Sequence, residues 1–504
     1  MMHPPPPTEN GPASRLAHLG RALCECAADV EAGSMEKAAR CLSRATGLAA
    51  AARDGPLPRL AAPVADCLAR RLIRPMVPAV AGALIDPSDH LDRRCVRAAR
   101  RSFFELSPFP KAAVAVGNRV ILEAMENEKN VHVIDLAGPA AQPSQWIQLL
   151  REFHSRPEGA PHLRLTIVHD DGEFLAKVSE SLTDEADELD VPFQVHCVAG
   201  QIETLDLNDL HGVLGLKSGE ASAIVCTTRL HRLLAAADDA ASSSLSAGHH
   251  FNQTASIARL QQMASGSCPP SIRGAACGDD DDDPYRSPAT PLGFVSPPLT
   301  TPPFQMPPAL AGFLSAARAA SPKVVVLVEQ EAGHNGASFR KRFAEALSYY
   351  AAAYDSLDAA AAAYRRPAAE RAEVERAVLG EEIRDVLLRE GARRRERHDR
   401  LHQWALRMEV AGFRSVPLSY AALRQGVDTL RRCGVGGCES REHGGCLLLC
   451  WRSWPLYSVS AWRPDRGSAY GVGSEEEYLS PSTPSAPPAH WFDELMCMAV
   501  QSLH

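Results

Sequence analysis

The chain has 504 residues, of which 45% are hydrophobic and 23% charged, and its formal net charge at pH 7 is -8. This composition is that of a globular protein, large enough for one big α/β domain or for about two or three average domains. The negative net charge excludes a general attraction to nucleic acid or acidic membranes, and no apolar run reaches the roughly 18–20 residues that a membrane span requires. The first residues, MMHPPPPTENGP, lack the apolar core of a secretory signal, so we expect a soluble intracellular protein.

The first part of the chain changes character twice. Residues 1–14 are rich in proline and predict a disordered tail. Leucine, alanine and cysteine then recur at three- and four-residue steps, which predicts a helical cap over residues 15–100. From there, strands alternate with helices over residues 101–238 and again over 306–464, so we predict two parts of one α/β core.

Two segments lack the composition of a packed core. Residues 239–305 contain five successive aspartates and the run SPATPLGFVSPPLTTPPFQMPP, and residues 465–504 are similar up to HWFDELMCMAV. Such stretches bury too little apolar surface to offset the entropy of ordering the chain. We predict a disordered insertion at 239–305 and a mostly disordered C-terminal extension at 465–504.

The predicted strands define the fold class. Apolar runs without alternation are typical of parallel strands covered on both faces, and they are VHVIDL (131–136), LRLTIVH (163–169), FQVHCV (193–198), SAIVC (222–226) and KVVVLVEQ (323–330). Helices are predicted at Phe339–Leu357, Glu370–Leu388 and Arg395–Ala411, and CLLLCW (446–451) with LYSVSAW (456–462) predicts a closing antiparallel pair. We therefore expect a Rossmann/methyltransferase-like doubly wound sheet with a helical cap subdomain.

The turn after the first predicted strand argues against cofactor chemistry. Asp135 is followed by Leu-Ala-Gly-Pro, which lacks the glycine spacing that lets a backbone close on a nucleotide. Asp170 and Asp171, after the second strand, stand where a methyltransferase holds ribose hydroxyls, but capping of the next helix is the stronger interpretation. Cys433, Cys438, Cys446 and Cys450 lack the paired spacing of a zinc site. We expect no catalytic residue, no cofactor and no metal.

Two arginine clusters are candidates for contact with nucleic acid. Arg93, Arg97, Arg100 and Arg101 fall on one side of a helix, and a second cluster comprises Arg393, Arg394, Arg395, Arg397 and Arg400. The alternative for both is a solvated helix whose arginines alternate with acids such as Glu105, Glu396 and Asp399.

The segment Leu230-His231-Arg232-Leu233-Leu234 has the Leu-x-x-Leu-Leu spacing of a short helix that docks in a partner's groove. Leu230, Leu233 and Leu234 are therefore a candidate partner-binding motif. Because the segment directly follows a predicted strand, packing of these leucines on the sheet is the stronger interpretation.

Taken in order, four separated elements resemble the plant GRAS family of transcriptional regulators, scarecrow-like group. Val131, His132, Val133, Ile134 and Asp135 match the family's VHIID element, between two leucine-rich helical regions. Arg342 and Phe343 belong to a PFYRE-like region, and Trp451, Trp454, Ser460, Ala461 and Trp462 match the closing SAW element.

The resemblance implies a nuclear protein that performs no catalysis and regulates transcription through partners. Those partners are zinc-finger transcription factors and other GRAS proteins, including the DELLA repressors, in gibberellin response and root development. It leaves open whether DNA is contacted directly or through partners, and whether the chain forms homodimers or heterodimers; no membrane is involved. The alternatives are a direct sequence-specific DNA-binding transcription factor and, more weakly, an S-adenosylmethionine-dependent methyltransferase.

Overall fold

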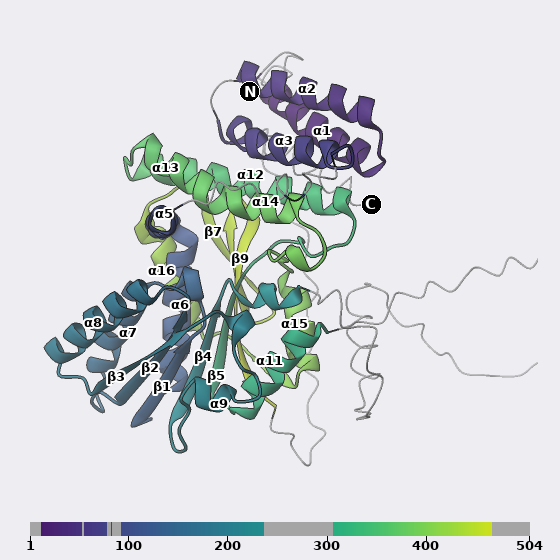
Figure 1. Cartoon of the computed structure of the whole chain (residues 1–504). Coiled ribbons are helices and arrows are strands. Elements are labelled where there is room, and N and C mark those ends of the chain that lie inside the picture. Colours follow the sequence, from purple (N-terminus) through teal and green to yellow (C-terminus); the bar gives the residue numbers. More distant parts are fainter. Residues whose placement is uncertain (1–11, 53–54, 78–81, 83–91, 236–305, 466–504) are drawn as a thin grey trace, which may run out of the picture. The chain divides into compact units, whose positions relative to one another are not determined.

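The structure is a computed structural model that describes residues 12–52, 55–77, 82, 92–235 and 306–465 (Figure 1). Every element below belongs to the larger of two units, which comprises residues 1–243 and 307–504. The predicted disordered insertion and the C-terminal extension after Asp465 lie outside the described residues. The predicted N-terminal tail is too long, because helix α1 already begins at Pro12.

A nine-stranded sheet forms the centre of this unit, with the strand order β3-β2-β1-β4-β5-β9-β8-β7 and with β6 paired to β9. The first five strands are parallel, and β5 pairs antiparallel with β9. The bounds are β1 Asn130–Asp135, β2 His162–His169, β3 Phe193–Ala199, β4 Ala221–Thr227, β5 Val324–Gln330, β6 Phe413–Val416, β7 Cys438–His443, β8 Cys446–Trp451 and β9 Trp454–Pro464. The predicted doubly wound sheet is confirmed, as is the closing antiparallel pair.

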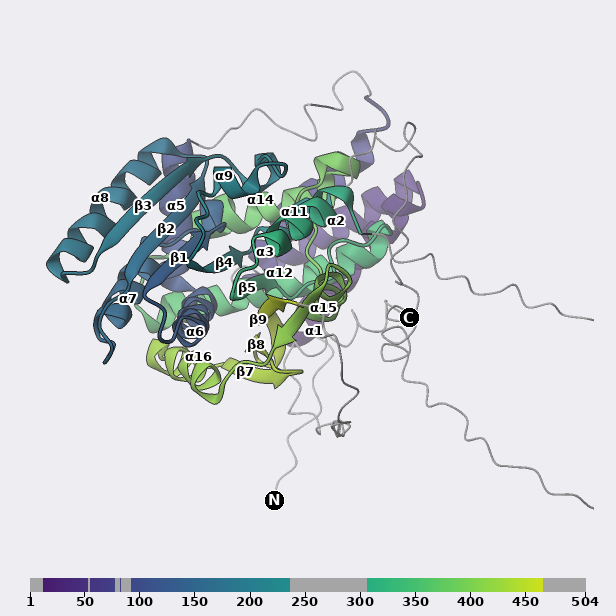
Figure 2. The same ribbon diagram turned by 90° about the horizontal axis from the view of Figure 1, so that it is seen from below.

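The central strands carry apolar side chains on both faces of the sheet, and these strands lie inside the core. All seven residues of β5 are buried, whereas β3, at the edge, alternates between exposed and half-buried residues. Helices cover both faces: α6, α7 and α16 lie on one, and α9 and α11 on the other (Figure 2). Their bounds are α6 Pro108–Ala124, α7 Pro143–His154, α8 Gly172–Glu188, α9 Leu210–Val213, α11 Pro308–Ala319, α15 Leu401–Val410 and α16 Tyr420–Cys433.

The helical cap packs on helices that follow β5. It consists of α1 (Pro12–Glu31), α2 (Met35–Ala52) and α3 (Pro56–Ile73), and α3 contacts both α12 (Phe339–Ala363) and α14 (Gly380–Leu388). The other side of α12 contacts β8 and β9. Because α12 is covered on both sides, it is buried over most of its length.

Helix α5 (Arg93–Leu106) connects the two levels of the unit. It contacts α13 (Ala368–Val374) and the π-helical turn Glu375–Leu379, and it also touches the short 3-10 turn after β1. Asp92 caps its first turn by accepting a hydrogen bond from the Arg94 backbone N–H. The helix thereby crosses the edge of the sheet at which the parallel strands end.

The helix predicted at Arg395–Ala411 is wrong over its first six residues. The chain is extended at 394–400, and α15 begins only at Leu401. Asp385 Oδ1 accepts hydrogen bonds from the backbone N–H groups of Arg395 and Glu396, both at 2.8 Å, and the Glu331 carboxylate accepts from Leu401 N. These N–H groups therefore bond to other segments instead of to carbonyls four residues earlier.

Among the described helices, none is long and apolar enough to cross a membrane.

Candidate functional site

The site lies at the carboxyl ends of the parallel strands, where open α/β sheets bind their ligands. Asp135 ends β1 and is buried, and its two oxygens accept hydrogen bonds at 2.8 Å from Ala137 N and from Trp146 Nε1 on α7. Burial raises the pKa of Asp135 to about 6, against the opposing effect of these two hydrogen bonds. The carboxylate thus holds its own turn to the following helix.

The rest of that turn faces a side chain from another strand. Gly138 has a φ of +53°, and a Cβ added there would lie 3.3 Å from Arg229 Nε. Arg229 follows β4, is 4% exposed, and its Nη2 lies 3.2 Å from the Glu203 carboxylate. Burial lowers the pKa of Arg229 to about 10. The space where a nucleotide would approach the β1 turn is therefore occupied by an internal ion pair.

Of the two acids after β2, Asp171 caps the next helix, as predicted, and Asp170 does not. Asp171 Oδ1 accepts hydrogen bonds from the backbone N–H groups of Glu173 and Phe174 at the start of α8. Asp170 Oδ2 accepts one from Gln201 Nε2 at 2.7 Å. Asp171 is thus used to begin α8, whereas Asp170 is exposed and bonds to a side chain on the loop after β3.

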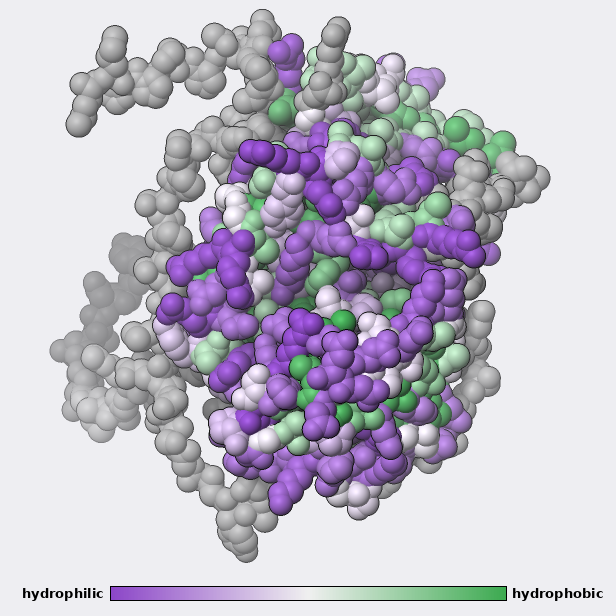
Figure 3. Space-filling model, turned by 90° about the vertical axis from the view of Figure 1, so that its left-hand side faces the viewer, coloured by the Kyte–Doolittle hydropathy of each residue, from purple (hydrophilic) through white to green (hydrophobic). Residues whose placement is uncertain are grey.

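Beside these turns lies a cleft of about 1140 Å³, here called the α5 cleft, between α5 and the loops after β1 and β2. Among the described residues, its lining carries six cations and four carboxylates, which are Arg94, Arg97, Arg100, Arg101, Lys111, Lys177, Glu105, Asp170, Asp171 and Glu173. Figure 3 shows the side of the molecule that carries α7 and α8, where hydrophilic residues predominate. The cleft is hence polar at its rim and slightly cationic.

The predicted basic face of α5 points into this cleft. Arg97 forms ion pairs with Asp171 and Glu173, and Arg101 lies 3.1 Å from Glu105. Arg100 also lines the cleft, whereas the side chain of Arg93 lies outside the described residues. The structure brings three of the four arginines together, and their contact with nucleic acid stays a prediction.

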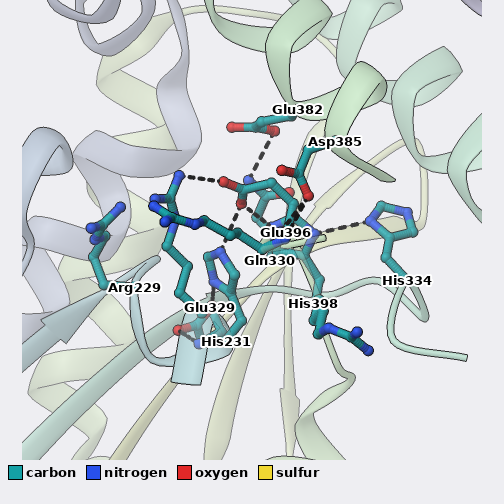
Figure 4. Close-up of polar contacts among 12 residues, drawn as sticks. Arg229, His231, Glu329, Gln330, His334, Glu382, Asp385, Glu396 and His398 are labelled. Atoms are coloured by element: carbon teal, nitrogen blue, oxygen red, sulfur yellow. Dashed lines mark hydrogen bonds and ion pairs between the residues drawn. The ribbon is translucent and has the colours of Figure 1, made fainter. Parts of the chain in front are cut away.

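Behind the cleft, a cluster of buried charges joins three distant segments (Figure 4). The two ring nitrogens of His231 lie 2.7 Å from Glu329 Oε2 and 2.8 Å from Glu396 Oε2, and Arg232 Nη2 lies 2.5 Å from Glu396 Oε1. Burial alone would lower the pKa of His231, but the two carboxylates outweigh it and raise this pKa to about 9. His231 therefore carries a positive charge at neutral pH and bridges β5 to the extended segment 394–400.

The same cluster contains the described residues that could hold a metal ion. Ligand atoms of His231, Glu396 and His398 all lie within 4.8 Å of one another. His398 Nδ1 is 3.0 Å from His334 Nδ1, and His398 Nε2 lies 3.4 Å from Glu396 Oε2, whereas His334 Nε2 has no hydrogen-bond partner among the described residues. Both nitrogens of His231 already face carboxylates, so a cation could bind there only after His231 lost a proton.

The second arginine cluster does not lie on a solvated helix, and two of its members are buried. Arg394 and Arg397 are 3% and 9% exposed. Arg394 Nη1 donates to the His334 carbonyl at 2.9 Å, Arg397 Nη2 donates to the Gly391 carbonyl at 2.6 Å, and Arg400 pairs with Glu345. Arg394, Arg397 and Arg400 thus bind carbonyls and acids inside the chain, which corrects both interpretations for these three residues. The side chains of Arg393 and Arg395 are exposed, and their contact with nucleic acid stays a prediction.

The candidate partner motif is buried. Leu230, Leu233 and Leu234 are 1–3% exposed in a 3-10 turn, and the Leu230 backbone N–H donates to Glu329 Oε1 at 2.8 Å. The leucines belong to the core, so they are not available to a partner's groove in this conformation. Their burial fits the alternative that they pack inside the chain, and the turn that carries them contacts α11 and the turn Ile202–Thr204.

The motif residues that carry the family resemblance have structural roles. Val131, Val133 and Ile134 are buried, and His132 Nε2 lies 2.8 Å from Thr166 Oγ1. Arg342 Nε donates to the Val386 carbonyl at 3.0 Å, next to the buried Phe343. In the closing strands, Trp451 Nε1 donates a hydrogen bond to Asp355 Oδ2, and Trp462 Nε1 donates one to Ser460 Oγ. Ala461 is buried, and Trp454 is half-buried.

Sequence reasoning missed Glu329, Glu396 and His398. One signal was available: β5 reads as five apolar residues followed by Glu-Gln-Glu, which places acids at the carboxyl end of a fully buried strand. Buried acids are rare unless they are paired. Their partners could not be found in this way, because His231 and Glu396 are distant in sequence.

Comparisons with known proteins agree on one family. The GRAS domain family matches residues 19–463. Scarecrow-like protein 3 of Arabidopsis thaliana is 37% identical over 90% of each chain, and GRAS family protein TF80 of Medicago truncatula is 32% identical over 88% of this chain and 94% of its own length. DELLA protein GAIP of Cucurbita maxima is 29% identical over 90% of this chain and 63% of its own. The crystal structure of SCL7 in Oryza sativa superimposes with a TM-score of 0.59 at 27% identity, over 83% of this chain and 94% of that one.

Proposed function

Since the chain belongs to the GRAS family, we propose that it is a plant transcriptional co-regulator that performs no catalysis and acts in the nucleus through protein partners. In this proposal the sheet is a rigid platform, and the surfaces of the cap and of the surrounding helices bind the partners. The output on transcription depends on what the assembled complex recruits.

The observation that carries this proposal is the occupied turn after β1. Asp135 is bonded to Ala137 and Trp146, and Arg229 with Glu203 occupies the space beside Gly138. A dinucleotide or S-adenosylmethionine bound at this turn would have to displace a buried ion pair and approach a backbone with one glycine. A platform for partners needs neither a cofactor nor a catalytic group.

The partners we propose are zinc-finger transcription factors and other GRAS proteins, including DELLA proteins, in gibberellin response and root development. Support comes from the similarity to Scarecrow-like protein 3 and to DELLA proteins, and from the matching motifs. Association with other GRAS chains would make homodimers or heterodimers part of the same function.

Proximity labelling with the full chain in root cells tests the partner proposal. We expect nuclear zinc-finger factors and GRAS proteins to be enriched over a control that carries the labelling enzyme alone. Enrichment confined to metabolic enzymes, or labelling confined to the cytoplasm, would overturn it.

A calorimetric titration with S-adenosylmethionine tests the enzymatic alternative. We expect no saturable heat of binding for the full chain. Saturable binding together with transfer of the methyl group to an acceptor would establish the methyltransferase instead.

Direct DNA binding is the second candidate, favoured by the three arginines of α5 that share one side of the helix. Against it, Arg97 and Arg101 already pair with acids, and Asp170, Asp171 and Glu173 stand beside them. Affinity for duplex DNA that falls with salt and is weakened by charge reversal at Arg93, Arg97 and Arg101 would support it. DNA binding that survives these changes would exclude this surface.

A further inference from the structure

Arg100 differs from Arg97 and Arg101 in its pairing, and from the exposed Arg94, whose side chain also has no ion pair among the described residues, in being half-buried. Arg97 pairs with Asp171, and Arg101 pairs with Glu105. Arg100 lines the α5 cleft between them, and no described residue forms a hydrogen bond or an ion pair with it. The cleft thus contains a guanidinium whose hydrogen-bond donors are not used within the described chain.

The surroundings of Arg100 make a direct anionic partner favourable. Burial lowers the pKa of Arg100. The carboxylates of Glu382 and Glu396 attract the charge of Arg100 from beyond contact distance, and the charge of Arg232 repels it. A charge that has lost part of its hydration without gaining a contact is costly, and a carboxylate can accept two parallel N–H bonds from a guanidinium. An anion in the cleft would supply the missing acceptor.

The lining of the same cleft also includes flat rings. The ring of Phe174 stacks on that of His169, with centroids 4.2 Å apart and an interplanar angle of 24°. Burial lowers the pKa of His169, so this ring is uncharged at neutral pH. Pro139 and Pro143 line the cleft as well. Such surfaces suit a planar apolar body.

The acids of the cleft limit how much negative charge it can accept. Asp170, Asp171 and Glu173 line the same cleft as Arg100 and would repel a second or third negative charge. A nucleic-acid backbone, with a phosphate at every step, meets this repulsion along its length. The arrangement favours a single negative charge placed at Arg100.

From these observations we propose that the α5 cleft binds a small organic monoanion, a planar apolar molecule with one carboxylate, whose charge is held by Arg100. The cleft volume of about 1140 Å³ is ample for such a molecule. This goes beyond the proposed function, because a co-regulator that acts through partners requires no small ligand. Bound beside α5, the ligand would join the sheet edge to the helices above it.

The test uses naphthoate and naphthamide, two probes of nearly equal shape of which only the first carries a charge. Calorimetry with the full chain should show one naphthoate site, with naphthamide bound about tenfold more weakly or worse, since tenfold corresponds to about 1.4 kcal/mol. Equal affinity for the two probes, or no saturable binding of naphthoate, would overturn the proposal.

Three variants locate the site. Arg100→Met should reduce naphthoate affinity to that of naphthamide, whereas Arg101→Met, one residue away and with a side chain 81% exposed, should leave both unchanged. Ala98→Trp changes an exposed residue that lines the cleft, so it should block both probes by filling the space with Arg100 intact. If Arg100→Met and Arg101→Met reduced naphthoate affinity equally, the attraction would be a general electrostatic one. If Ala98→Trp left the binding of both probes unchanged, the probes would bind elsewhere. Either result contradicts the proposal.

Discussion

At the scale of single residues, His231 shows how one buried side chain connects segments that are far apart in sequence. Its imidazolium bridges Glu329 at the end of β5 and Glu396 in the extended segment. Such a group stabilises the fold only while it is charged, because a neutral ring can donate to one of the two carboxylates but not to both.

The first prediction is a loss of stability in alkaline solution. The folded-state pKa of His231, about 9, lies above the ordinary value of 6.5. Its contribution is therefore complete below pH 6.5 and is lost as the pH rises through about 9, with an upper bound on the order of 3 kcal/mol. Unfolding midpoints measured from about pH 6 to about pH 10, which brackets the two pKa values, should fall for the natural chain and stay flatter for His231→Gln. Parallel curves for the two proteins would refute this role of His231.

The second prediction concerns the closing tryptophans. Trp462 is 1% exposed and its Nε1 donates to Ser460 Oγ at 2.9 Å. Trp462→Ala should lower the free energy of unfolding by about 3–5 kcal/mol, through a cavity and lost apolar burial. Trp454→Ala, at a half-buried position of the same strand, should cost less, and circular dichroism during urea unfolding compares the two. Equal losses would mean that burial of Trp462 does not determine its contribution.

At the scale of elements, the sequence predicted what depends on local pattern. The parallel strands could be predicted because each is an apolar run, as in β5, where all seven residues are buried. Strand β7 could not, because CESREH is mostly exposed and joins the sheet only by pairing with β8. The extended segment 394–400 was predicted as helix, since nothing local reveals that Asp385 accepts its backbone hydrogen bonds.

The packing of α16 on α6 yields the third prediction. A Cβ added to Gly426 would lie 2.9 Å from both Leu447 Cδ2 and Val116 Cγ2. Gly426→Ala should therefore destabilise the chain by about 1–3 kcal/mol through overpacking. Gly47→Ala, at an exposed position of helix α2 where a Cβ would meet nothing within 4 Å, should stabilise by up to about 1 kcal/mol. Thermal unfolding midpoints should thus move in opposite directions, and a matching rise in both variants would show that α16 does not approach α6 this closely.

At the scale of the whole molecule, the strand order of the sheet does not by itself predict that a cofactor binds. The sheet has the strand order of a cofactor-binding protein, and the missing glycines after β1 predicted that this chemistry is lost. What fills the turn could not be predicted, because Arg229 and Glu203 come from other loops and meet only in the folded chain. The buried cluster behind it has the same origin, with His231, Glu329 and Glu396 contributed by three segments.

A platform of this kind should reach DNA through other proteins. In a mobility-shift experiment, the full chain is added to a duplex alone and to the same duplex already bound by a zinc-finger factor recovered by proximity labelling. We predict no shift of the free duplex at physiological salt, and a further shift of the duplex that carries the factor. A salt-sensitive shift of the free duplex, with no added shift when the factor is bound, would contradict a co-regulator that acts through its partners.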